Sequence, residues 1–313
     1  MAHLVKLEDY VSRYEVDIQQ YPSQYTRLKR ERWQQLQRAW AEANQGVGAE
    51  YPDDEDWFAD VQQSFWQYAL QKVSGIYKRQ PNDEKSDHDD KNHHLVGKSR
   101  ESLLAFFYYE WMQSQLKWAS SSSSEESVLD SKYRYDSRLR EFLRLLPDNY
   151  MVFYYPVFRI QQADVQLDVL LLSPSEIYCV TYVETPPHTL FEGGSNRFWR
   201  EFRSKKEYKR LNPLLAVKRM EDVVQSIFQA NGIYFPVQKV VLLPAAIVDD
   251  TELAHNVTIV DHRGYDQWMN NIGRHASPMK KIQFQAAECL LGQGKTRAYS
   301  KGHMVETSEE QSR

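Results

Sequence analysis

Asp168 is the residue whose type and position could do the most specific chemistry in this sequence. It lies in LDVLLLSPSEIYCVTYVE, residues 167–184, which predicts two β-strands joined by a turn at residues 174–175. A two-residue turn pairs Asp168 with Thr181, and side-chain alternation puts Val183 on the same face. A magnesium nuclease site can be built on such a hairpin. It needs an Asp on one strand, then an acid and a Lys two residues apart on the next.

Asp168 also has a purely structural interpretation. An Asp at the end of a strand can accept hydrogen bonds from backbone N–H groups, or it can pair with a basic residue such as Arg138 or Lys205. The residue types leave both interpretations open.

Three features around this hairpin point to a known family. They are the predicted helix YRYDSRLREFLRLLP before the first strand, the segment LDVLLLSPSEIYCV, and LNPL at the start of a later helix. With these features the sequence resembles the nuclease-related domain, NERD, of the PD-(D/E)XK restriction-endonuclease-like superfamily, over roughly residues 131–273. The resemblance implies an α/β fold with a restriction-endonuclease-like core of helix, three-strand meander, helix and strand.

The resemblance also implies positions for a catalytic site. Asp168 matches the family Asp, and the helix Glu of the family falls near Asp136. The E-x-K of the family falls on residues 181–183, where Thr181 and Val183 replace the acid and the Lys. The resemblance therefore implies an eroded site, with no cofactor.

Two replacements could restore a magnesium site. Glu184 lies next to the missing acid, but strand alternation puts it on the opposite face unless a bulge shifts the register. The ammonium could come from Lys205, Lys206 or Lys209 of the following segment, which we expect to be helical. Mg²⁺ would be the cofactor if both replacements hold.

The most basic run of the sequence is RSKKEYKR, residues 203–210. It is either a solvated helix face or a surface that contacts the phosphates of DNA. The candidate nucleic-acid-binding residues are Arg203, Lys205, Lys206, Lys209 and Arg210.

Composition restricts the function classes. The 313 residues carry a formal net charge of -4, which gives no overall attraction to nucleic acid. The two cysteines, Cys179 and Cys289, are far apart in sequence, and a disulfide framework is not expected. The sequence shows no signal peptide and no apolar run of the ~20 residues that span a bilayer. We expect a soluble cytoplasmic protein without a membrane partner.

The pattern along the chain predicts an all-α N-terminal domain followed by the α/β domain. Two polar segments are predicted to be linkers, and the C-terminal tail is predicted to be disordered. The predicted parts are a helical domain at 1–80, a flexible acidic and His-containing linker at 81–98, a helix at 99–119 that packs with the N-terminal domain, a Ser-rich linker at 120–127, the NERD-like domain at 128–291 and the tail at 292–313.

Two further motifs have ordinary interpretations. In GQGKT, residues 292–296, the first Gly of a phosphate-binding loop would fall on Cys289, and a helix-like stretch precedes the motif in place of a strand. His88, His93 and His94 are metal ligands by type, but they lie in the first predicted linker.

Three functions follow from these patterns. The first is a catalytically inactive nuclease homologue that binds nucleic acid or a protein. The second is a divergent Mg²⁺-dependent DNA nuclease that uses Asp136, Asp168, Glu184 and a migrated Lys. The third is a docking platform whose N-terminal helices bind a protein partner, without nucleic-acid binding.

Overall fold

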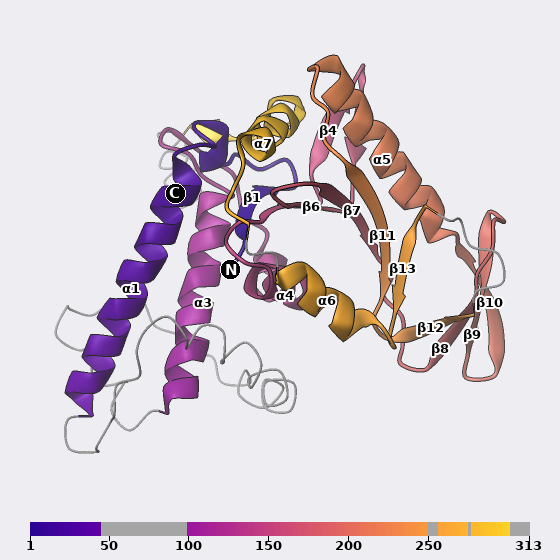
Figure 1. The fold of residues 1–313 in the computed structure, drawn as a ribbon, viewed down its shortest axis with the longest axis horizontal. Helices are drawn as coiled ribbons and strands as arrows, with labels where there is room; N and C mark the ends of the chain where they lie inside the picture. The colour runs from indigo at the N-terminus through magenta and orange to yellow at the C-terminus, as the bar shows by residue number, and fades with distance from the viewer. Residues whose placement is uncertain (45–98, 250–255, 275–276, 301–313) are drawn as a thin grey trace, which may run out of the picture. The chain divides into compact units, whose positions relative to one another are not determined.

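The computed structural model describes residues 1–44, 99–249, 256–274 and 277–300 (Figure 1). The chain divides into two compact units. Unit 1 consists of Met1–Thr26 and Trp111–Arg313, and unit 2 is Arg27–Glu110. Within the described ranges, no helix combines the length and apolar character needed to cross a membrane.

A six-stranded mixed sheet forms the centre of unit 1. Its middle strands β3, β6 and β7 are antiparallel neighbours, whereas β1, β11 and β13 each pair in parallel with the strand beside them. The predicted mixed α/β fold and its three-strand meander are therefore confirmed. In spatial order the strands are β1 (His3–Leu7), β3 (Met151–Tyr154), β6 (Val169–Leu172), β7 (Ile177–Tyr182), β11 (Val237–Leu243) and β13 (Thr258–Asp261).

Helices cover both faces of this sheet. On one face, α5 (Pro213–Ala230) and α7 (Lys281–Gln293) bury apolar side chains against Leu170 and Cys179. Tyr178, which alternates with Cys179, points to the other face and meets Trp268 of α6 (Tyr265–Gly273). The amphipathic helix α4 (Ser137–Leu145) packs beside α6 and β3, as the sequence pattern predicts.

A second, four-stranded sheet follows β7. The order is β10 (Lys206–Leu211), β9 (Phe198–Arg203), β8 (Thr189–Glu192) and β12 (Ala246–Asp249). The segment that contains Lys205, Lys206 and Lys209 was expected to be helical, and this prediction is therefore wrong. Charged residues occupy seven of the twelve positions of β9 and β10 and lie on both faces, so hydrophobicity shows no clear two-residue period.

The remaining elements are short or lie at the edges. The hairpin of β4 (Val157–Ile160) and β5 (Ala163–Gln166) interrupts the meander after Pro156. β2 (Glu125–Glu126) pairs with β14 (Tyr299–Ser300), and 3₁₀ turns occupy Arg13–Glu15 and Ser131–Arg134.

The predicted N-terminal domain needs a correction at its start. Residues 1–80 were expected to be helical, but β1 is the edge strand of the central sheet and pairs with β3. The pairing joins residues almost 150 positions apart, so no local pattern reports it. The predicted helices α1 (Tyr21–Ala43) and α3 (Arg100–Trp118) are present.

Much of the predicted N-terminal region cannot be compared with the structure. Residues 45–80 of the predicted helical domain and the linker at 81–98 lie outside the described residues, and so do His88, His93 and His94. Docking of a protein partner by the N-terminal helices therefore stays a prediction.

Two segments expected to be flexible are held in place. In the Ser-rich segment 120–127, the Ser127 hydroxyl accepts from the Val11 N–H at 2.8 Å and donates to the Arg297 carbonyl at 2.7 Å. The Arg297 N–H in turn donates to the Asp9 carbonyl at 2.7 Å. Both the predicted linker and the start of the predicted tail are thus part of unit 1, and residues 301–313 lie outside the described residues.

Gln115 of α3 closes the free edge of the central sheet. Its side-chain Oε1 accepts from the Leu4 N–H at 2.9 Å, and its Nε2 donates to the Ala2 carbonyl at 2.6 Å. Because Gln115 and Leu4 are fully buried, water cannot replace these bonds.

We predict that Gln115→Ala lowers the free energy of unfolding by about 1–3 kcal/mol, the usual cost of leaving buried polar groups without partners. Urea unfolding of the full chain measures this value. Lys117→Ala, on the exposed side of the same helix, is the matched control and should change it by less than about 0.5 kcal/mol. Equal effects of both variants would contradict the proposed role of Gln115.

Candidate functional site

Asp168 and Thr181 face each other at the end of the β6–β7 hairpin. The pairing of Val169 with Val180 places Asp168 opposite Thr181, which confirms the predicted register. The Thr181 hydroxyl donates to Asp168 Oδ2 at 2.6 Å. Asp168 is half-buried and Thr181 is buried, so this contact satisfies a carboxylate that is partly removed from water.

Apolar packing occupies the position where the family Lys would lie. Val183 is only 7% exposed and packs with Val217 of α5 and with Leu243. The Thr181 hydroxyl also lies 3.6 Å from the Met220 sulfur of the same helix. This side of the hairpin is therefore closed by α5, and it offers Asp168 a neutral hydroxyl in place of a second carboxylate.

Asp136, the candidate for the helix carboxylate, caps α4. Its Oδ1 accepts from the Leu139 N–H at 2.9 Å, and its Oδ2 accepts from the Tyr154 hydroxyl at 2.9 Å. The N-terminus of a helix leaves backbone N–H groups without acceptors, and Asp136 supplies one of these acceptors. Each carboxylate oxygen of Asp136 therefore has a structural partner.

Glu184 does not join Asp168. The register of β7 runs without a bulge from Ile177 to Tyr182, so strand alternation keeps Glu184 on the opposite face. Its carboxylate, 76% exposed, forms an ion pair with Arg138 of α4. The bulge that this replacement required is absent from β7.

Arg138 connects three side chains near the ends of β3 and β7. Its guanidinium carbon lies 4.0 Å from the centroid of the Tyr182 ring, and its Nη1 donates to the Tyr155 hydroxyl at 2.5 Å. The sequence suggests Arg138 as a partner of Asp168, but in the structure it pairs with Glu184. In the sequence, the aromatic residues at positions 154, 155 and 182 are the feature that could have indicated this cluster.

The phenols of this cluster are weak acids. Burial raises the pKa of Tyr182 to about 12. Burial also raises the pKa of Tyr155, against the opposing effect of Arg138. Both hydroxyls therefore keep their protons at neutral pH. Their pKa values do not suit a general base that would take a proton from water at that pH.

The side chains around Asp168 do not fit a magnesium ion. Magnesium sites in proteins use carboxylate oxygens together with water, and a nuclease site adds an ammonium. Across the described part of the chain, no three His, Cys, Asp or Glu residues are grouped so as to hold a metal. In the same ranges, no ion pair involves Asp168.

The predicted nucleic-acid-binding residues lie on the β9–β10 hairpin and not on a helix. Arg203 and Arg210 both approach the buried carboxylate of Glu201, with N–O distances of 3.6 and 2.8 Å. Lys205 forms the turn with Ser204, and the two have positive φ angles of 62° and 50°. The expected helix that would supply an ammonium to Asp168 is therefore wrong.

Lys206 and Lys209 are exposed on β10. The ion pairs of the described residues leave these two lysines and Lys205 without a carboxylate partner. Three cations of this hairpin are thus available to an outside anion.

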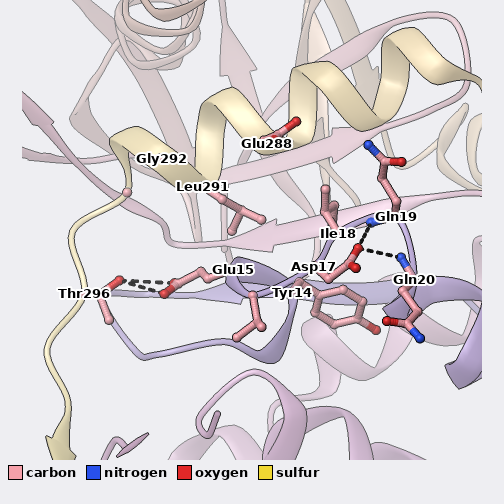
Figure 2. A pocket seen from close by; sticks show the side chains of 12 residues that line it. Tyr14, Glu15, Asp17, Ile18, Gln19, Gln20, Glu288, Leu291, Gly292 and Thr296 are labelled. Carbon is pink, nitrogen blue, oxygen red and sulfur yellow. Dashed lines mark hydrogen bonds between the residues drawn. The ribbon is translucent and has the colours of Figure 1, made fainter. Parts of the chain in front are cut away.

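A separate groove of about 860 Å³ lies between residues 14–20 and the end of α7 (Figure 2). Its lining includes Glu15 and Thr296, whose side chains point toward each other. Behind them the buried Lys6 ammonium pairs with Glu15 and donates to the Thr296 hydroxyl at 2.8 Å. The single Lys within the apolar run HLVKL was the signal for this cluster, which none of the sequence predictions included.

The same contacts give GQGKT a structural role. Thr296 is the last residue of this motif, and Lys295 before it donates its backbone N–H to the Val157 carbonyl at 2.7 Å. Lys295 Nζ forms an ion pair with Asp164 at 2.6 Å. The motif begins in the last turn of α7, whereas a phosphate-binding loop would precede a helix.

Comparison with known proteins identifies a family for the middle of the chain. The family model of the nuclease-related domain, NERD, matches residues 131–244. A protein of Geobacillus stearothermophilus, named RNA 2',3'-cyclic phosphodiesterase, is 34% identical over 85 residues. These residues are 27% of this chain and 26% of that protein, so the chain spans about a quarter of the length of this relative.

No solved structure matches the chain, and the restriction-endonuclease-like core stays a prediction. The family match includes α4, the meander that carries Asp168, the β9–β10 hairpin and all of β11. The resemblance predicted from the hairpin sequence is therefore confirmed by the match of residues 131–244 to the nuclease-related domain family.

Proposed function

We propose that this nuclease-related domain is a non-catalytic module that binds nucleic acid. The observation that carries the proposal is the pair of substitutions beside Asp168. Thr181 replaces the acid and donates its hydroxyl to Asp168, and Val183 replaces the Lys and packs in the core.

These two substitutions remove the charges that phosphodiester hydrolysis needs. A metal-dependent nuclease holds its cation between carboxylates and neutralises the charge that develops on the phosphate. Here Asp168 has a neutral donor, Asp136 caps α4 and Glu184 pairs with Arg138 on the other face. The side chains are arranged to stabilise the fold at this position.

The β9–β10 hairpin supports nucleic acid as the partner. Residues 197–211 contain seven basic and two acidic residues, whereas the whole chain has a net charge of -4. A local excess of cations on a chain of opposite overall charge favours phosphate contacts at that place. The Geobacillus relative has a name that refers to RNA, so RNA belongs among the ligands tested.

We predict that the full chain does not cleave linear or single-stranded DNA or RNA with Mg²⁺ or Mn²⁺. The assay compares the wild type with Asp168→Ala on labelled oligonucleotides separated on a gel. Metal-dependent cleavage that disappears in Asp168→Ala would overturn the proposal, because it would show that Asp168 works with partners from elsewhere.

We also predict salt-sensitive binding that depends on the hairpin. Lys205→Gln, Lys206→Gln and Lys209→Gln together should weaken binding and reduce the slope of log K against log salt by about 2 to 3, since three phosphate contacts are lost. Fluorescence anisotropy at several salt concentrations measures both quantities.

The matched control for this triple variant changes three exposed lysines on helices, Lys117, Lys218 and Lys281, to Gln. It removes the same total charge from the chain. If the control weakened binding as much as the hairpin variant, the hairpin would not be the binding surface.

A further inference from the structure

The outer face of β9 carries two aromatic rings, one exposed and one half-buried. Trp199 is 1% exposed and packs with Phe191, and its indole N–H donates to the Gly194 carbonyl at 3.0 Å. Because side chains alternate along a strand, the burial of Trp199 turns Phe198 and Phe202 to the opposite side. Phe198 is 49% exposed as a result.

Cations lie beside these rings. The guanidinium carbon of Arg197 lies 5.7 Å from the centroid of the Phe198 ring. The guanidinium carbon of Arg200 lies at the same distance, 5.7 Å, from the centroid of the Phe202 ring. Lys209 of β10 lies directly across from Arg200. We call these five residues the ring–cation strip.

Two carboxylates share the face of the strip, one on each side of β9. Glu192 of β8 pairs with Arg200, and Glu207 of β10 lies across from Phe202. Lys209 and Arg197 form no ion pair among the described residues, and the turn adds Lys205 near the Phe202 end of the strand. The three cations of the strip outnumber the two carboxylates, so this face keeps a net positive charge.

We propose that the ring–cation strip binds single-stranded nucleic acid, with bases stacked on Phe198 and Phe202 and phosphates held by Arg197 and Lys209. This inference rests on the proposed function and specifies its ligand. A duplex hides the faces of its bases, whereas a single strand exposes them to aromatic side chains. The two rings are four residues apart, about 13 Å along the strand, so each can receive a different base.

β10 is the edge strand of this sheet, so the hairpin has no neighbouring strand on that side (Figure 1). The same face continues over the exposed Leu190 and Ile247 of β8 and β12. A protein partner would use those two apolar residues, while a nucleic acid would use the rings and cations of the strip. The exposed cations favour the nucleic acid.

The test measures dissociation constants by fluorescence anisotropy for a labelled single-stranded oligonucleotide and for the matched duplex. Phe198→Leu keeps an apolar side chain but removes the ring, and Phe198→Tyr keeps the ring. We expect Phe198→Leu to weaken single-strand binding about tenfold and duplex binding less than about twofold. Phe198→Tyr should bind the single strand like the wild type.

Tyr234→Leu is the matched control, because Tyr234 is an aromatic residue 90% exposed outside the strip. It should leave both constants unchanged. The same circular dichroism spectrum and melting temperature for all variants would show that Phe198→Leu, at a surface position, preserves the fold.

The outcomes separate this inference from the proposed function. The strip inference is wrong if the hairpin Lys→Gln variant weakens binding but Phe198→Leu does not. It is also wrong if Phe198→Leu weakens binding of the single strand and of the duplex equally. In both cases the proposed function stands. If the wild type binds neither form, the proposed function is wrong and the inference fails with it, which leaves this face to a protein.

Discussion

A half-buried carboxylate needs either a cation or a hydrogen-bond donor, and at Asp168 the donor is the hydroxyl of Thr181. The contact spans the ends of β6 and β7, where the register of the hairpin fixes both side chains. The neutral donor satisfies Asp168 without a second carboxylate or an ammonium. At this position the hydrogen bond holds the ends of two strands together.

The two faces of the central sheet keep the remaining charges apart. On one face, Val183 after β7 and Met220 of α5 place apolar atoms beside the Asp168–Thr181 contact. On the other, Arg138 of α4 binds Glu184 and Tyr155. Because strand alternation assigns neighbouring residues to opposite faces, a single substitution beside Asp168 cannot bring the Arg138 cluster to it.

The same alternation organises the hairpin of the second sheet. Burying Trp199 and Glu201 on the inner face turns Phe198, Arg200 and Phe202 outward. The β9–β10 hairpin thus presents rings and cations on the face opposite Trp199. Under the proposed function, binding uses this hairpin and not the position of Asp168.

Local patterns were enough for part of this structure. The turn at residues 174–175 fixes the pairing of Asp168 with Thr181, and the sequence predicts α4 and the helix that begins at LNPL, which is α5. Two other kinds of feature depend on contacts that no local pattern reports. β1 pairs with a strand far along the sequence, and the charges of β9 and β10 conceal their alternation. The candidate site divides in the same way. The sequence itself shows that positions 181 and 183 have no acid and no Lys. The partners of Asp136, Arg138 and Glu184, in contrast, depend on how α4 packs against the sheet.

The central claim is that Asp168 is a hydrogen-bonding residue and not a metal ligand. Titration of Mn²⁺ into the full chain and into Asp168→Ala, followed by the electron paramagnetic resonance signal of the free ion, tests it most directly. We predict that the wild type and the variant take up Mn²⁺ equally weakly. A one-to-one site that is present in the wild type and lost in Asp168→Ala would contradict the account.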